Sequence, residues 1–204
     1  MALSADKKAM LKHLAAAGDL AALEALSLEA TGRAGLVSLG AVAAKSVTGI
    51  HASVFGDAVG PVVITTALSA PARARNASVV AGATYDGGTV SLTGLNQFGL
   101  PQTEDIIPVA GTTVYGTKIW KSVSQVAYPG GGVGTHATNT LSIGTGDKIG
   151  ALFDVLDTMG MGLMQATAGA ANTPEAVTVD PTNNAVTFTT VPDGTKVLIF
   201  VGNL

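Results

Sequence analysis

The stretch Val90-Ser-Leu-Thr-Gly-Leu95 decides the expected fold of this chain. Apolar residues alternate in it with small residues, and successive side chains of a β-strand point to opposite faces of a sheet. One face of this strand should therefore be buried and the other should meet water. The sequence Asn96-Gln-Phe-Gly-Leu-Pro101 follows, and its composition predicts a turn into the next strand.

The same kind of sequence continues over most of the chain. From about Val47 it is rich in Val, Thr, Ile, Gly and Asn, with turn dipeptides between short apolar runs, which is typical of an all-β sandwich or barrel. The expected strands are 62–68, 78–84, 89–95, 103–109, 119–127, 140–143, 162–167, 176–179, 185–190 and 196–201. This pattern predicts a mainly β fold, an antiparallel β-sandwich of Greek-key or jelly-roll type.

Two turns are expected near the end of the chain. Asp180-Pro-Thr-Asn-Asn184 contains the side chains that form Asx turns, and we interpret it as such a turn rather than as a calcium loop, because it lacks the alternating acidic ligands of an EF-hand. Pro192-Asp-Gly194 should join the last two expected strands as a terminal hairpin.

The first part of the chain has a different composition. Residues 4–33 are rich in Ala, Leu, Lys and Glu, and Ser4 and Asp19 are candidate caps of two helices separated by Gly18. We expect a short helical hairpin or bent helix here. The chain then divides into an N-terminal helical arm and linker, residues 1–46, and a β-sandwich domain, residues 47–204.

Two segments leave the sequence interpretation open. The glycine-rich run 130–136 is expected to be a mobile loop. Residues 151–164 fit either a helix or a pair of strands, because an apolar stripe at helical spacing is interrupted by Gly160 and Gly162. We favour strands for this segment.

Composition limits the classes of partner. Only 12% of the residues are charged while 47% are hydrophobic, and the mean hydropathy is +0.43. No apolar run approaches the roughly 20 residues of a spanning helix, and His13, Asp19 and Glu24 interrupt the apolar stretch that a secretion signal would need. We therefore expect no membrane association. A weakly charged exterior should instead be covered by other proteins.

The charge balance argues against nucleic acid as a partner. The net charge is −3 and the pI is near 5.5, whereas phosphate backbones are bound by clustered Lys and Arg. Arg73 and Arg75 are close together, and we interpret them as part of a solvated turn. The chain has no cysteine, which excludes disulfides and thiolate metal sites and is compatible with assembly in a reducing cytoplasm.

A search for catalytic groups predicts no catalytic, cofactor-binding or metal site. The three histidines, His13, His51 and His136, are not at metal-ligand spacing with each other or with an acid. Glu104 and Asp105 are adjacent on an expected strand, so they should point to opposite faces and serve to keep an edge or loop soluble. The segment 144–150 lacks the order of a phosphate loop and is interpreted as a turn between strands.

The single tryptophan admits two interpretations. Trp120 lies in an expected strand, and its favoured role is packing at a sheet or subunit contact. The alternative is a sugar-stacking platform formed by Trp120, Tyr115 and Tyr128, although aromatic residues make up only 4% of the chain.

Several of these stretches resemble a recurrent pattern in structural proteins of tailed bacteriophages. The similar segments are residues 90–104, 116–126, 144–150 and 177–196. They are strand and turn patterns, they span most of residues 48–200, and the helical arm is not part of the resemblance. The resemblance implies a virion role, with capsid decoration (cement) and head-fiber-type proteins as the most similar group, and it transfers no catalytic residue.

These observations lead to an expected function. We expect a non-enzymatic capsid decoration protein on the virion surface, with the major capsid protein as partner and a closed homo-oligomer such as a trimer as its state. The alternatives are another phage structural component, in the tail or the head-to-tail connector, and a carbohydrate-binding adhesive β module. An enzyme is the least favoured class.

Overall fold

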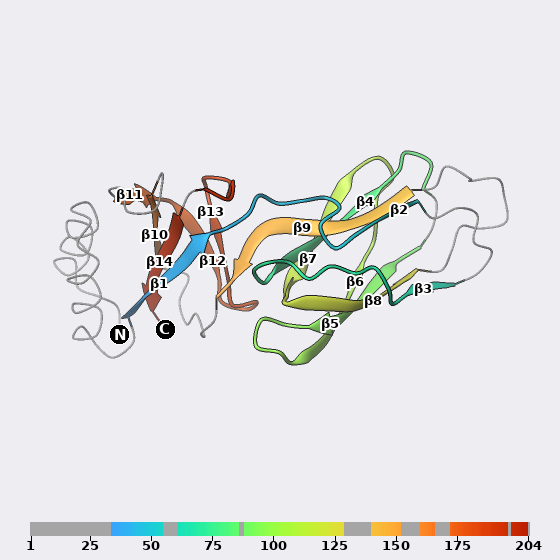
Figure 1. Cartoon of the computed structure of the whole chain (residues 1–204), viewed down its shortest axis with the longest axis horizontal. Helices are drawn as coiled ribbons and strands as arrows, with labels where there is room; N and C mark the ends of the chain where they lie inside the picture. Colours follow the sequence, from blue (N-terminus) through green and yellow to red (C-terminus); the bar gives the residue numbers. More distant parts are fainter. Residues whose placement is uncertain are drawn as a thin grey trace. The chain divides into compact units, whose positions relative to one another are not determined.

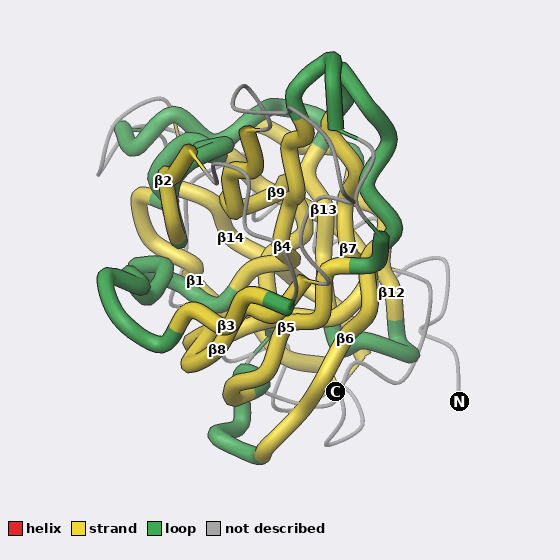
Figure 2. The backbone as a smooth tube through the Cα atoms, turned by 90° about the vertical axis from the view of Figure 1, so that its right-hand side faces the viewer, coloured by secondary structure: helices red, strands yellow, loops and turns green. Residues whose placement is uncertain are grey.

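The computed structural model describes residues 34–54, 61–85, 88–128, 140–151, 160–165, 172–195 and 197–203. This part of the chain is mainly β with antiparallel strand pairing, and none of it is helical (Figures 1 and 2). The expected helical arm and the glycine-rich run 130–136 lie outside the described residues. The strands are β1 (Ala34–Ala41), β2 (His51–Val54), β3 (Val62–Ile64), β4 (Arg75–Ala81), β5 (Val90–Leu95), β6 (Pro101–Ile106), β7 (Thr113–Trp120), β8 (Ser122–Tyr128), β9 (Thr140–Gly150), β10 (Gly160–Gln165), β11 (Asn172–Glu175), β12 (Val177–Asp180), β13 (Ala185–Phe188) and β14 (Val197–Asn203).

Contacts along the chain form two compact units. One unit, Lys45–Leu152, is continuous, and the other combines Met1–Ala44 with Phe153–Leu204. The first of these boundaries lies close to the expected division between residues 46 and 47, and a second one follows Leu152. The division into domains 1–46 and 47–204 stays a prediction.

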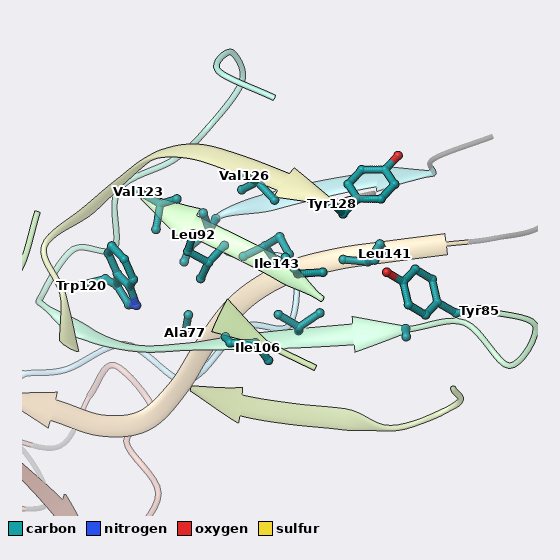
Figure 3. Close-up of a cluster of buried hydrophobic side chains, with 14 residues drawn as sticks. Ala77, Tyr85, Leu92, Ile106, Trp120, Val123, Val126, Tyr128, Leu141 and Ile143 are labelled. Atoms are coloured by element: carbon teal, nitrogen blue, oxygen red, sulfur yellow. The ribbon is translucent and has the colours of Figure 1, made fainter. Parts of the chain in front are cut away.

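The Lys45–Leu152 unit contains two groups of antiparallel strands. In one, β9 pairs with β2 and β4, and β4 also pairs with β7. In the other, the order is β3-β8-β5-β6. Their buried side chains form one hydrophobic cluster, in which Ala77 and Ile143 of the first group accompany Leu92 and Val126 of the second (Figure 3). The two sheets of this unit therefore share a core.

The alternation that decided the expected fold is confirmed. Val90 and Leu92 are completely buried, while Ser91 and Thr93, which follow them in turn, are only partly buried. Every second side chain of β5 thus enters the core, as the pleat of a strand requires.

A shared irregularity marks the middle of β4. The pairing registers of β4 with β7 and with β9 both shift beside Asn76, as in a β-bulge. The buried Asn76 side chain bridges the interruption, because its Nδ2 donates to the carbonyl of Gly116 at 3.0 Å and its Oδ1 accepts the N–H of Lys148 at 3.0 Å. A Cβ at Gly146 would lie 2.4 Å from that Oδ1, so the bridge needs glycine there.

The expected turn at 144–150 is wrong, because these residues form the second half of the strand β9. The glycine-rich composition of 144–150, which resembles that of a turn, is explained by close packing. The chain at Ser46 and Val47 runs so close to β9 that a Cβ on Gly144 would lie 2.1 Å from the carbonyl oxygen of Ser46. Thr145 fixes this contact, since its N–H donates to Ser46 O at 2.7 Å and its Oγ1 accepts the N–H of Ser46 at 3.1 Å.

Other strands depart from the expected list. β1, β2, β11 and most of β7 were not expected. The expected strand 119–127 covers the end of β7, the corner at residue 121 and most of β8. The chain turns there at Lys121, whose N–H donates to Leu95 O at 2.9 Å. In the ambiguous segment 151–164, residues 160–164 belong to the strand β10, as we favoured, and 152–159 lie outside the described residues.

The second unit holds a four-stranded antiparallel sheet of order β1-β14-β10-β11 and the hairpin β12–β13. The predicted turn at 180–184 is confirmed, since Asp180 Oδ1 and Oδ2 accept from the backbone N–H and the side-chain Nδ2 of Asn183 at 3.2 and 2.9 Å. The predicted terminal hairpin is wrong. β13 pairs with β12, whereas β14 pairs with β1 and β10.

We predict that Gly144→Ala destabilises the chain by about 1–3 kcal/mol, the usual cost of forcing extra atoms into a packed site. The added methyl group would collide with backbone at Ser46 and Val47, which no side-chain rotation can relieve. Urea denaturation followed by circular dichroism measures the change. Ser142→Ala, at a partly buried position of the same strand, is the control and should shift stability by less than about 0.5 kcal/mol. Equal effects of the two substitutions would contradict the close approach.

We also predict a loss of stability in alkaline solution that depends on Tyr128. Burial, and secondarily the neighbouring Tyr85, raises the pKa of Tyr128 to about 12 from its ordinary value of 10. Between pH 10 and 12 the unfolded chain loses this proton before the folded chain does, so stability should fall as pH rises, by at most about 1.4 kcal/mol per pH unit. Denaturation from pH 8 to 12 tests this. The fall should be shallower in Tyr128→Phe, and identical slopes would contradict the assignment.

Candidate interaction surface

The adjacent carboxylates Glu104 and Asp105 point to opposite faces of β6, as expected, but one of them is not a solubilising group. Glu104 is buried. Its Oε1 accepts the N–H groups of Thr117 and Lys118 at 2.6 and 3.1 Å and the Thr117 hydroxyl at 3.1 Å, and its Oε2 accepts the indole N–H of Trp120 at 3.1 Å. The prediction that both carboxylates keep an edge soluble is therefore wrong for Glu104. Its acceptor capacity is used in holding β7, which leaves this carboxylate a structural role.

The three aromatic residues of the possible sugar platform do not lie on one surface. Trp120 is completely buried and Tyr128 is 5% exposed, both within the hydrophobic cluster (Figure 3). Tyr115 is exposed, and the Nζ of Lys45 lies 5.5 Å from the centre of its ring. Stacking on a sugar requires exposed ring faces. The structure therefore does not form the platform, and the favoured packing of Trp120 at a sheet contact is confirmed.

The basic residues singled out in the sequence are placed differently from the expected turn. Arg75 lies in β4 and is buried, which lowers its pKa through loss of hydration, while the charge of Asp147 acts in the opposite direction. Arg73 precedes the strand and is partly buried. The interpretation of both as a solvated turn is wrong for Arg75.

An ion pair lies near the start of the Lys45–Leu152 unit. The Nζ of Lys45 is 2.6 Å from Asp147 Oδ2, and this hydrogen bond is the main cause of the raised pKa of Lys45. Both side chains remain partly in contact with solvent, and such pairs contribute at most about 1 kcal/mol.

The candidate catalytic groups do not converge within the described residues. His51 lies on β2, with its Nδ1 3.1 Å from the carbonyl oxygen of Ala67, and His13 and His136 fall outside the described part. In that part no three His, Asp or Glu side chains gather as metal ligands would. Among the described residues there is no helix long and apolar enough to cross a membrane.

The outward face of the sheet β3-β8-β5-β6 carries unusually little charge. Leu92, Glu104 and Val126 point inward in one paired row, so the next row points outward. We call this outward surface the neutral face. Its paired rows are Val63–Ala127–Ser91–Asp105, then Gln125–Thr93–Thr103, then Ser122–Leu95–Pro101.

Asp105 is the ionisable member of these rows, and Ser91 Oγ donates to its Oδ1 at 2.5 Å. The rest of the neutral face consists of hydroxyl, amide and aliphatic groups. With Asp105 as its ionisable group, few charges on this face would have to be stripped of water when another protein covers it. This arrangement suits contact over an area rather than recognition of one small ligand.

The neutral face continues into an apolar turn at one end, which we call the 95–100 turn. Phe98 and Leu100 are 43% and 60% exposed there, next to Leu95. Asn96 fixes the backbone beneath them, because its Oδ1 accepts the N–H groups of Phe98 and Leu100 at 3.0 and 2.9 Å. Gly99 has a φ of +83°, the left-handed conformation that favours glycine. The turn thus holds two large apolar side chains in a fixed position toward solvent.

Sequence reasoning predicted a wet face for β5 and a turn at 96–101, but it did not identify either as a surface. The available signal was the absence of charge at alternate positions of β5 combined with Phe and Leu inside a turn. Exposed Phe and Leu on a tight turn contribute little to a core, and next to Leu95 they make this end of the sheet apolar.

Comparison of the chain with protein-family models, with curated proteins and with solved structures gave no match.

Proposed function

We propose that this chain is a decoration (cement) protein of a tailed-bacteriophage capsid, which binds the outer surface of the assembled head and bridges major capsid protein subunits. The observation that carries the proposal is the neutral face with its 95–100 turn, an exposed and weakly ionised surface on a well-packed β unit. The resemblance of residues 90–104 and 116–126 to phage structural proteins supports the same role. Both stretches contribute strands to the sheet that carries this face.

The physical basis is distributed burial. A stable protein contact covers about 800 Å² on each partner, and a sheet face with an adjoining turn offers a continuous surface to which neighbouring parts of the chain can add. A shell repeats the same contact many times, so each one can be modest while the assembly gains stability through multivalency. The low charge of the chain favours this, since little electrostatic repulsion opposes close apposition.

The proposal includes a finer description of the fold and the assembly. The two sheets of Lys45–Leu152 that share one core are proposed to form an antiparallel β-sandwich of Greek-key or jelly-roll type. The protein is proposed to act without catalysis, as a closed homo-oligomer such as a trimer, on the capsid surface after assembly in the host cytoplasm. Symmetric closure would match the local symmetry of a shell.

Binding to capsid shells tests the function. We predict that the chain cosediments with assembled shells and raises the temperature at which heat disrupts them. Phe98→Ser combined with Leu100→Ser should weaken binding at least about tenfold, because each side chain would lose about 1.5–3 kcal/mol of apolar burial. Cosedimentation titration and heat disruption followed by light scattering measure both effects.

The matched control is Val191→Ser, which removes another exposed apolar side chain outside the neutral face. It should bind like the unaltered chain, and all variants should unfold at similar denaturant concentrations. Shells that neither bind the chain nor gain thermal stability would refute the proposal. Labelled electron microscopy of virions distinguishes the alternative tail or connector location, because the label would then appear away from the head surface.

A further inference from the structure

The strands β6 and β7 end the strand orders β3-β8-β5-β6 and β9-β4-β7. The outward backbone groups of such strands can pair with a strand of another chain, so natural proteins protect them. Here two backbone N–H groups of β7, those of Thr117 and Lys118, donate to the Glu104 carboxylate of β6. One carboxylate therefore takes the place that a neighbouring strand's carbonyl groups would occupy.

Two more hydrogen bonds extend the contact along the part of β6 that precedes Glu104. Gln102 Nε2 donates to the carbonyl of Ile119 at 2.7 Å, and Lys118 Nζ donates to the carbonyl of Thr103 at 2.6 Å. Each bond joins a side chain of one strand to the backbone of the other. We call this set of side-chain bonds the β6–β7 seam.

The position of the carboxylate is closely defined. Trp120 donates its indole N–H to Glu104 Oε2, and a Cβ on Gly116 would lie 2.6 Å from the same oxygen. Gly116 therefore leaves room for the carboxylate against β7, and the indole fixes its orientation. Trp120 is the only tryptophan of the chain and is completely buried, so its fluorescence reports directly on the seam.

We propose that Glu104 is a latch that closes the edge of β7 against strand addition by a second copy of this chain, and that the β6–β7 seam is where the Lys45–Leu152 unit opens first. The other strands of this unit are joined by backbone ladders, such as that between β4 and β9, whereas the seam is held by side chains around one carboxylate. When the carboxylate is removed, the N–H groups of Thr117 and Lys118 lose their acceptor. Each then becomes available to a carbonyl of another strand.

The test compares Glu104→Ala and Glu104→Gln in the full chain, with Asp105→Asn as the control. Asp105 is the neighbouring carboxylate, but it lies on the neutral face and bonds Ser91. Three quantities are measured: amide hydrogen exchange by NMR, acrylamide quenching of Trp120 fluorescence, and molecular mass by sedimentation velocity over a hundredfold range of concentration.

For Glu104→Ala we expect exchange at Thr117 and Lys118 to accelerate at least tenfold, while Val79 and Ile143 in the β4–β9 ladder change less than twofold. Trp120 should become more accessible to acrylamide, and the molecular mass should rise with concentration above that of the unaltered chain at the same concentration. Glu104→Gln keeps one acceptor oxygen at nearly the same volume, so its effects should be in the same direction and smaller. Asp105→Asn should leave all three quantities unchanged.

Other outcomes would overturn the proposal. Equal acceleration at all four amides would mean that Glu104 supports the whole unit rather than a local seam. Unchanged exchange at Thr117 and Lys118 would mean that these groups do not depend on the carboxylate. A variant that opens yet keeps the molecular mass of the unaltered chain at every concentration would refute the protection against strand addition. If Glu104→Ala does not fold, the same criteria apply to Glu104→Gln.

Discussion

The amide side chain of Asn76 is the interaction on which the Lys45–Leu152 unit depends. β4 lies between β7 and β9, and its ladders with both neighbours are interrupted at nearly the same point. Interruptions on both sides of a buried strand would leave backbone groups without partners, which costs free energy far from water. Asn76 carries both a donor and an acceptor, so it bonds Gly116 on one side and Lys148 on the other. Neither an aliphatic side chain nor a carboxylate could serve both neighbours.

Glu104 meets a related requirement at the end of the same β7 strand. Its carboxylate only accepts, and the groups facing it, two backbone N–H groups, an indole N–H and the Thr117 hydroxyl, all donate to it. In both places a glycine leaves the space that the polar side chain fills, Gly146 beside Asn76 and Gly116 beside Glu104. Part of the high glycine content of this chain therefore reflects close packing of side chains onto backbone. It is not all turn formation.

The contrast between glycines that serve close packing and glycines that form turns explains how much of the fold could be predicted from the sequence. The alternation in 90–95 identified β5 because one of its faces is wet, and the Asx turn at 180–184 was predictable because its hydrogen bonds are local. The segment 144–150 was misinterpreted because its glycines serve tertiary contacts: Gly144 approaches Ser46 and Val47, about a hundred residues away along the chain, and Gly146 approaches Asn76. Glu104 was misjudged for the same reason, since its partners Thr117 and Trp120 become neighbours only after β6 and β7 are placed. Sequence patterns report local periodicity, whereas these residues owe their positions to tertiary contacts.

The candidate surface was predictable only in part, again because of register. Alternation gives the set of outward residues on each strand, but the rows that make a continuous face require the pairings of Ser91 with Ala127 and Asp105. In the folded unit, the β6–β7 seam and the neutral face differ in how their polar groups are used. Along the β6–β7 seam the backbone groups are engaged by side chains, which hinders association by strand pairing. The face of the β3-β8-β5-β6 sheet presents small neutral groups instead, which can be covered without stripping water from charges. The distribution of polar groups therefore favours association through the neutral face over association through the β6–β7 seam. Association through the face also leaves the strand order of each sheet unchanged.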